Sequence, residues 1–256
     1  VWRTISRLKP SVRWDGQYSS YEEALKAAGG SYADPKIIEK VADATRQVRD
    51  GRAVFERDSV LFDRPQYSWP MVSAVLHAAL ARSKWDQPLR VVDLGGALGT
   101  HYFQLRPFLS GVPLRWRVLE QQAFVELGNA EFADGSLEFI DAANLGAERP
   151  DLVICSSVLQ YIDGVEKVLG QLIRLKPRAV FIDRTSVTRD GGDFWTVQSV
   201  PKSIYAAKYP CRIFSQPSLL RIMGNSYRLR ADGECEREIF ERFLLKYFWL
   251  VNNTSS

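Results

Sequence analysis

The sequence predicts an α/β fold in which a mainly parallel sheet carries helices on both faces and follows a helical N-terminal prefix. After Pro88, short apolar runs alternate with helical patterns, the order expected when crossover helices join parallel strands. Before Pro88, apolar residues recur at the spacing of helical faces. A chain of 256 residues can form one such domain with an appended segment. We therefore expect two parts, a helical segment over residues 1–85 and a sheet domain over residues 86–256.

The prefix contains three helical patterns separated by chain-breaking residues. The first, Tyr21–Ala28, follows an aromatic loop and ends at two glycines placed as a helix stop. The second keeps one apolar face from Ile37 to Val48, and the third covers Met71–Leu80 after two Xaa-Pro breaks. Roughly the first 85 residues are therefore expected to be mostly helical.

The sheet domain is expected to contain five strands separated by helices and then two more strands without a helix between them. The strands are placed at 89–94, 114–120, 136–140, 151–156, 179–183, 226–231 and 240–251. The helices are placed at about 100–109, 121–129, 158–175 and 217–223. Residues 236–243 also fit the beginning of a helix.

Composition argues against several classes of partner. The formal net charge of +4 comes from Lys and Arg residues dispersed along the chain, without the basic block of a nucleic-acid-binding arm. No run approaches the ~18 apolar residues that span a membrane. Three widely spaced cysteines, without a Cys-x-x-Cys pair, support neither a metal site nor a disulfide framework and favour a reducing compartment. We expect a cytoplasmic protein without a nucleic-acid partner, a membrane span or a bound metal.

A glycine-rich turn follows the strand expected at 89–94 and precedes a helix, an arrangement that directs backbone N–H groups at a ligand. The residues Asp93, Gly95, Ala97 and Gly99 follow the spacing D-x-G-x-G-x-G, with alanine replacing the middle glycine. The dinucleotide spacing G-x-G-x-x-G fits poorly, because it would place Ala97 and Thr100 at glycine positions. Glycines that only permit close packing are the alternative interpretation.

This turn resembles motif I of the class I methyltransferases that depend on S-adenosyl-L-methionine (SAM). The order of five β-α steps followed by a strand pair is similar to their Rossmann-like sheet of seven strands, of which the last is antiparallel. The resemblance implies SAM as the cofactor. It places the cofactor-binding residues at Asp93, Gly95, Gly96, Ala97, Gly99, Glu120, Asp141 and Ser156.

Two acidic residues at strand ends carry part of this assignment. Glu120 follows Gly95 by 25 residues, near the spacing at which an acidic side chain meets the ribose hydroxyls of a nucleoside. Asp141 follows the third strand, where such enzymes often contact the adenine amino group. Asp141 is equally suited to cap the turn at 142–145.

Further short stretches narrow the resemblance. Trp14-Asp15-Gly16, the turn itself, Leu159-Gln160-Tyr161 and Thr196-Val197-Gln198 make the chain similar to a little-characterised bacterial family of predicted methyltransferases associated with surface-polysaccharide genes. The resemblance implies methyl transfer to oxygen or nitrogen of a small-molecule or saccharide acceptor. The exit of the fourth strand lacks the Asn-Pro-Pro-Tyr form associated with methylation of nucleic-acid bases.

Two side chains are candidates for removing a proton from the acceptor. His101 follows the turn directly, at a helix N-terminus that is expected to lower its pKa and keep it neutral. Asp183 ends the fifth strand, at the sheet edge where ligands of open α/β sheets bind. An ion pair with Arg184 is the structural alternative for Asp183, and the acceptor need not lose a proton to a base at all.

The acceptor pocket is expected where the chain adds to the sheet, in the prefix and in the long segment Thr185–Gln216. The candidate acceptor contacts are Trp14, Tyr18, Tyr161, Trp195, Gln198 and Tyr205. Core packing is the alternative role for each of these aromatic residues. Residues 1–85 are thus expected to cover the substrate of a SAM-binding domain at 86–256. A catalytically inactive SAM-binding protein and a nicotinamide-dependent oxidoreductase are the competing functions.

Overall fold

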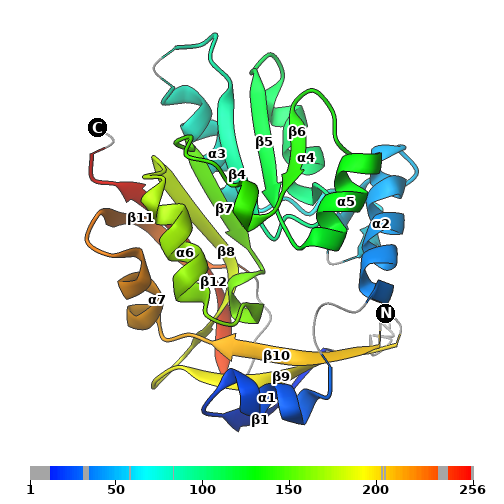
Figure 1. Ribbon diagram of the computed structural model, residues 1–256, viewed down its shortest axis with the longest axis vertical. Helices are drawn as coiled ribbons and strands as arrows, with labels where there is room; N and C mark the ends of the chain where they lie inside the picture. Colours follow the sequence, from blue (N-terminus) through cyan, green and yellow to red (C-terminus); the bar gives the residue numbers. More distant parts are fainter. Residues whose placement is uncertain are drawn as a thin grey trace, which may run out of the picture.

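The protein is described here by a computed structural model that covers residues 12–30, 35–57, 59–82, 84–202, 204, 206–235 and 242–254. Its central feature is a seven-stranded sheet with the order β11-β12-β8-β7-β4-β5-β6 (Figure 1). The strands are β4 (Leu89–Leu94), β5 (Leu114–Leu119), β6 (Leu137–Ile140), β7 (Leu152–Ser156), β8 (Ala179–Thr188), β11 (Tyr227–Glu234) and β12 (Phe243–Asn252). Strand β12 is antiparallel to both of its neighbours, and the other pairs are parallel. The expected seven-stranded sheet with an antiparallel last strand is confirmed.

Helices cover both faces of this sheet because its central strands are apolar on both sides. The helices are α1 (Tyr21–Ala28), α2 (Pro35–Arg49), α3 (Trp69–Leu80), α4 (Thr100–Leu105), α5 (Gln122–Glu131), α6 (Val165–Arg174) and α7 (Gln216–Met223). Short 3-10 turns lie at η1 (Arg106–Leu109), η2 (Ala142–Asn144) and η3 (Leu159–Tyr161). Val91 of β4 faces one core with α2 to α5, whereas the adjacent Val92 faces a second core with α6 and α7. Among the described residues, no helix has the length and apolar character needed to cross a membrane.

A second, three-stranded antiparallel sheet has no counterpart among the predicted elements. It contains β1 (Arg13–Tyr18), β9 (Phe194–Val200) and β10 (Ala207–Ile213), with β9 in the centre, and α1 packs on it (Figure 1). Residues 13–18, expected as an aromatic loop before the first helix, form a strand instead. The prefix also contains a small hairpin, β2 (Phe55–Arg57) and β3 (Val60–Phe62). In addition, β8 continues five residues past its predicted end at Asp183.

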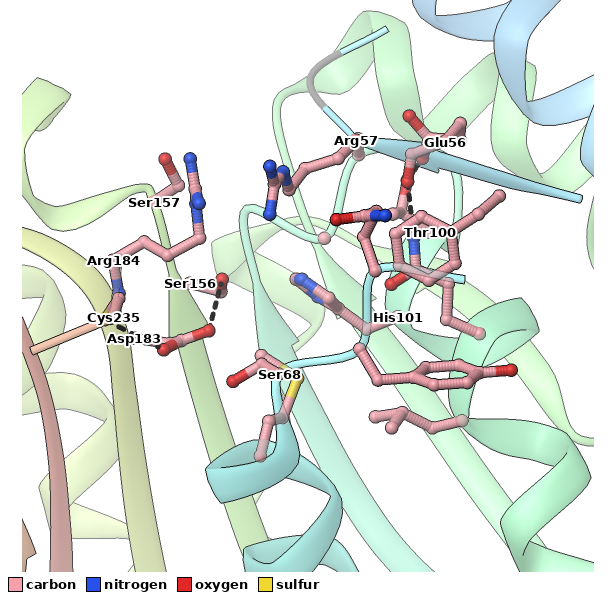
Figure 2. A pocket seen from close by; sticks show the side chains of 18 of the residues that line it. Glu56, Arg57, Ser68, Thr100, His101, Ser156, Ser157, Asp183, Arg184 and Cys235 are labelled. Carbon is pink, nitrogen blue, oxygen red and sulfur yellow. Dashed lines mark hydrogen bonds between the residues drawn. The ribbon is translucent and has the colours of Figure 1, made fainter. Parts of the chain in front are cut away.

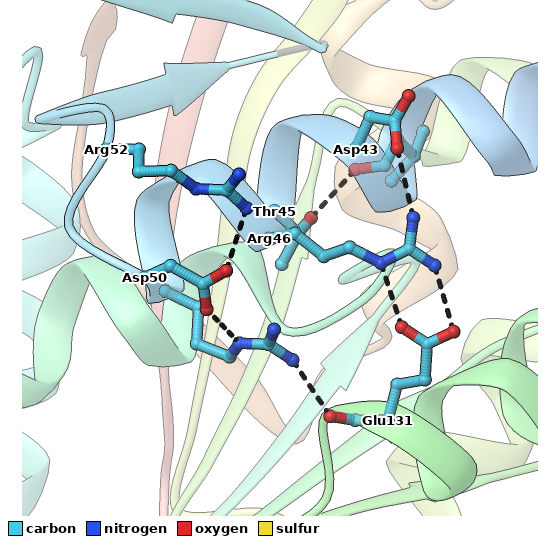
Figure 3. Close-up of polar contacts among 8 residues, drawn as sticks. Asp43, Thr45, Arg46, Asp50, Arg52 and Glu131 are labelled. Carbon is cyan, nitrogen blue, oxygen red and sulfur yellow. Dashed lines mark hydrogen bonds and ion pairs between the residues drawn. The ribbon is translucent and has the colours of Figure 1, made fainter.

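An arginine–carboxylate contact joins the prefix to the sheet domain. Figure 3 shows Arg46 of α2 facing Glu131 at the end of α5, with Nε and Nη2 each 2.9 Å from a carboxylate oxygen. Arg49, one turn later, donates to the backbone carbonyl of Glu131 at 3.1 Å. The contact is bidentate, which favours Arg over Lys at this position.

We expect the Arg46–Glu131 pair to contribute about 0.5–1 kcal/mol, because it is bidentate but roughly one third exposed. A double-mutant cycle with Arg46→Ala and Glu131→Ala, measured by urea unfolding, isolates this coupling. The matched control is a cycle with Arg52→Ala and Asp50→Ala, whose arginine is 62% exposed. Equal coupling energies in the two cycles would contradict a stabilising role for the bidentate Arg46–Glu131 contact.

Candidate functional site

A cavity of about 810 Å³ lies beyond the carboxyl ends of β4 and β7 and beside Asp183 and Arg184 in the middle of β8. This is the switch point of the sheet. After β4 the chain adds β5 and β6 on one side, whereas β7 and β8 lie on the other side of β4. The turn after β4, the start of α3 and the β2–β3 hairpin complete its walls. Figure 2 shows His101, Ser156, Asp183, Arg184 and Arg57 around this space.

A buried carboxylate holds His101 at the wall of the cavity. Both oxygens of Asp93 lie 3.1 Å from Nδ1 of His101, and Nε1 of Trp116 donates to Asp93 at 3.2 Å. Asp93 is fully buried at the end of β4. A carboxylate acceptor at this position means that Nδ1 carries a proton, so Nε2 is the nitrogen left for other partners.

The pKa of His101 is raised, contrary to the expectation of a lowered value. Burial alone would lower it, but the charge of Asp93 and its hydrogen bond outweigh the cost of burial. The charges of Asp183 and Glu56 raise the pKa further. Helix α4 has only six residues, and the neighbouring carboxylates decide the protonation of His101.

The glycines of the turn meet demands of packing as well as of backbone conformation. A Cβ atom at Gly96 would lie 2.4 Å from Oδ2 of Asp93, and one at Gly95 would lie 2.3 Å from Cγ2 of Val158. The alternative interpretation of the glycines, close packing, is therefore realised at both positions. The backbone of Gly95, Gly96 and Ala97 also lines the cavity, whereas Gly99 begins α4 with φ at 91°.

Asp183 lies across the cavity in a small polar cluster. It accepts from Sγ of Cys235 at 3.4 Å and from Oγ of Ser156 at 3.5 Å. Burial raises the pKa of Asp183, although Cys235, Arg184 and His101 act in the opposite direction. Ser156 thus lies on the cavity wall, as its assignment requires, but its hydroxyl is directed at Asp183 (Figure 2).

Four described cavity residues other than glycine adopt left-handed backbone conformations. Their φ angles are 63° at Ser59, 52° at Ala97, 54° at Ser157 and 49° at Arg184. Such conformations cost energy in residues with a Cβ atom and cluster at functional sites. Ala97 and Ser157 follow β4 and β7, Arg184 lies within β8, and Ser59 lies in the turn of the β2–β3 hairpin.

Glu120 follows β5, next to the turn but outside the cavity wall. Its carboxylate accepts from the N–H of Gln121 at 2.9 Å and from the N–H of Ala97. Burial raises its pKa to about 7, because these hydrogen bonds only partly offset the loss of water. No basic side chain pairs with Glu120 within the part of the chain that the structure describes.

Asp141 follows β6 and caps η2. Its Oδ1 accepts from the N–H and from the side-chain amide of Asn144, both at 2.9 Å. The capping role that the sequence left open is therefore realised, and Asp141 does not line the cavity.

The residues expected to touch the acceptor pack the small sheet instead. The ring of Trp14 meets Phe243 edge-on at 5.1 Å, and Trp195 meets Tyr21 at 5.2 Å. Gln198 accepts from the Tyr161 hydroxyl at 2.9 Å. The members of this set that the structure describes, namely Trp14, Tyr18, Tyr161, Trp195 and Gln198, do not line the cavity. Tyr205 lies outside the described residues.

Other residues, which sequence analysis did not single out, form the outer walls. They come from the β2–β3 hairpin, the start of α3 and the loop before it, the end of β11, and the middle of β8 and β12. The main ones are Glu56, Arg57, Tyr67, Ser68, Trp69, Arg184 and Tyr247. The two Xaa-Pro breaks at 64–65 and 69–70 mark this loop in the sequence, but they carry no information about what the loop faces.

No family model and no curated protein sequence matches the chain. One solved structure that resembles it is Burkholderia thailandensis 1,6-didemethyltoxoflavin-N1-methyltransferase with bound 1,6-didemethyltoxoflavin and S-adenosylhomocysteine. Its identity is 15% and its TM-score 0.47, over 96% of this chain and 97% of that chain.

Two further solved structures show a similar degree of likeness. An S-adenosylmethionine dependent methyltransferase from Mesorhizobium loti has 12% identity and a TM-score of 0.47, over 72% of this chain and 97% of that chain. The glycopeptide N-methyltransferase MtfA complexed with S-adenosylhomocysteine has 11% identity and a TM-score of 0.46, over 71% and 89%. These likenesses are too distant to assign an activity, so the assignment depends on the chain's own residues.

We expect Asp93→Asn to lower the pKa of His101, because burial would then act against weaker, more distant carboxylates. NMR titration of the imidazole signals measures this, and the chain has only two histidines. His77 is the internal control, since its pKa is lowered by burial and by Arg230 and it does not line the cavity. An unchanged His101 titration would contradict the role of Asp93.

The same pair has a signature in stability. Because the folded-state pKa of His101 is raised, its contribution to the free energy of unfolding is complete below the ordinary histidine value of about 6.5. The contribution is lost as the pH rises through the folded-state pKa. Unfolding curves over this pH window should show the loss in the parent and not in Asp93→Asn.

Proposed function

We propose that the protein is a SAM-dependent methyltransferase that acts on a small-molecule acceptor. The observation that carries the proposal is Glu120, a partly buried carboxylate directly after β5 that accepts from the N–H of Ala97 in the turn after β4. The pKa of Glu120 is elevated because its carboxylate has lost water and gains only two backbone N–H donors. Two ribose hydroxyls would supply further hydrogen-bond donors to this carboxylate. The seven-stranded order with antiparallel β12 supports this reading over a dinucleotide fold, whose sheet is parallel throughout.

The described residues fit this cofactor at three points. Glu120, next to the turn and outside the cavity wall, would hold the ribose. The backbone of Gly95–Ala97 would face the methionine part, and Ser156 lines the same cavity as these turn residues. Asp141 would meet the adenine only if it retains a free oxygen, because Oδ1 already caps η2. When bound, SAM supplies a methyl group on a positively charged sulfur.

The protein's own contribution to the reaction is positioning and proton removal. Asp93 holds Nδ1 of His101, which leaves Nε2 to accept a proton from the acceptor at pH values above the raised pKa of His101, where the imidazole is neutral. Asp93 also stabilises the imidazolium that forms, so it is a positioning residue, while His101 is the catalytic base. The charge of Asp183 acts on His101 across the cavity. Asp183 and Ser156 together would orient the acceptor.

We further propose a cytoplasmic location and a substrate-covering role for residues 1–85. Three free thiols at Cys155, Cys211 and Cys235 support a reducing, cytoplasmic compartment. The β2–β3 hairpin and the start of α3 lie in residues 1–85, and their place on the cavity wall supports the role of the prefix as a substrate cover.

Calorimetric titration with SAM, S-adenosylhomocysteine and NAD tests the proposal. We expect the first two to bind and NAD not to bind. Glu120→Ala should weaken S-adenosylhomocysteine binding by about 1–3 kcal/mol, the range for hydrogen bonds to a charged group. Arg46→Ala, remote from the site, is the control for nonspecific effects of mutation.

The pH dependence of binding gives a sharper test of the same residue. Ribose hydroxyls favour the ionised form of Glu120, so affinity should rise as the pH increases through about 7, and binding should release a proton. In Glu120→Gln this rise should disappear. Parent-like affinity in both Glu120 variants would refute the ribose assignment.

A further inference from the structure

The acceptor side of the cavity has an aromatic wall drawn from separate parts of the chain. Phe55, Tyr67 and Trp69 form a continuous edge-on series, with ring centroids 5.6 Å apart at each step. Tyr247 of β12 also lines the cavity and stacks on Phe181. Planar ligands gain most from such rings, by stacking and edge contacts.

Trp69 occupies an unusual position in this wall. It is the first residue of α3, it lines the cavity, and 62% of its surface is exposed. Its neighbours Tyr67 and Phe108 hold one side of the indole at 5.6 and 6.1 Å. An indole fixed in this way at a rim offers an apolar contact surface with little further loss of side-chain freedom.

Polar groups converge on the same space. His101 presents its outer nitrogen to the cavity, and the guanidinium groups of Arg57 and Arg184 extend toward the space above it (Figure 2). The carboxylates that face His101 are Asp93, Asp183 and Glu56, and Glu56 itself accepts from the Thr100 hydroxyl. A negative charge that forms on an acceptor here would therefore meet an imidazolium and two guanidinium groups.

From these walls we infer that the acceptor is a planar aromatic or heteroaromatic compound with an acidic O–H or N–H group, and not a saccharide. The inference rests on the proposed function and specifies its substrate class. Proton transfer to an imidazole is efficient from an acidic phenol or ring N–H, whereas an alcohol hydroxyl of a sugar is a far weaker acid.

The reaction consists of proton transfer to His101 and methyl transfer from sulfur to the acceptor. The acceptor O–H or N–H bond breaks and its proton moves to Nε2 of His101. The acceptor oxygen or nitrogen then forms a bond to the methyl carbon while the bond from that carbon to sulfur breaks. The electron pair of the broken bond remains on sulfur, which leaves neutral S-adenosylhomocysteine, the methylated acceptor and an imidazolium held by Asp93.

The test uses 4-nitrophenol as the probe, with the protein saturated in S-adenosylhomocysteine. The phenolate form of this probe absorbs visible light, so binding and ionisation are read together without turnover. We expect saturable binding as the phenolate, at least tenfold tighter than binding of 4-nitroanisole, which has no acidic proton. Methyl glucoside should not compete with the probe.

Matched variants separate the two parts of the inference. Trp69→Ala should weaken probe binding at least threefold, whereas Trp85→Ala, an equally exposed tryptophan outside the cavity wall, should not. His101→Gln should abolish the spectral shift to phenolate, whereas His77→Gln should preserve it. Circular dichroism checks that each variant is folded. If His101→Gln does not fold, binding of the probe by Trp69→Ala still tests the inference.

The outcomes are distinguishable. Normal S-adenosylhomocysteine binding without probe binding, or with displacement of the probe by methyl glucoside, would overturn the acceptor class and leave the proposed function intact. Failure of S-adenosylhomocysteine itself to bind would overturn the proposed function and this inference together.

Discussion

The burial of one charge, the carboxylate of Asp93, determines much of the site. A carboxylate without solvent is costly unless its oxygens are hydrogen-bonded, and Trp116 and His101 supply those bonds. The same carboxylate leaves no room for a side chain at Gly96, and it raises the pKa of His101. Asp93 and Gly96 thus have an internal, structural reason to occur together in this chain. The carboxylate positions a histidine at the cavity wall.

The sheet could be predicted from the sequence to a greater extent than the rest of the chain. The runs at 89–94 and 152–156 are short, apolar and followed by turns, so local pattern suffices to place β4 and β7. Strand β1 could not be placed in this way, because Arg13–Tyr18 is mostly polar and becomes a strand only by pairing with β9, about 180 residues later. Its partner is a property of the fold and not of the local sequence.

The candidate site could be predicted only where its residues follow strands. The positions of His101 and Ser156 on the cavity follow from the rule that ligands bind at the carboxyl ends of strands, and Asp183 also lines the cavity although β8 continues past it. The protonation of His101 could not be predicted, because it depends on three carboxylates from different elements. Nor could the outer wall, since aromatic residues in a loop before α3 look the same in sequence as aromatic residues in a core.

The small sheet has a role at the site that differs from the one expected of it. Tyr161 of η3 is held by Gln198 of β9 and packs on Tyr209 of β10, while Gln160 donates to the carbonyl of Arg184 at 3.2 Å. These contacts brace the two segments that carry Ser157 and Arg184, whose left-handed backbones need surroundings that hold them in place. The aromatic residues of this sheet therefore act one layer behind the cavity. They hold the backbone at Ser157 and Arg184 in place, while the hairpin and the start of α3 form the outer wall of the cavity.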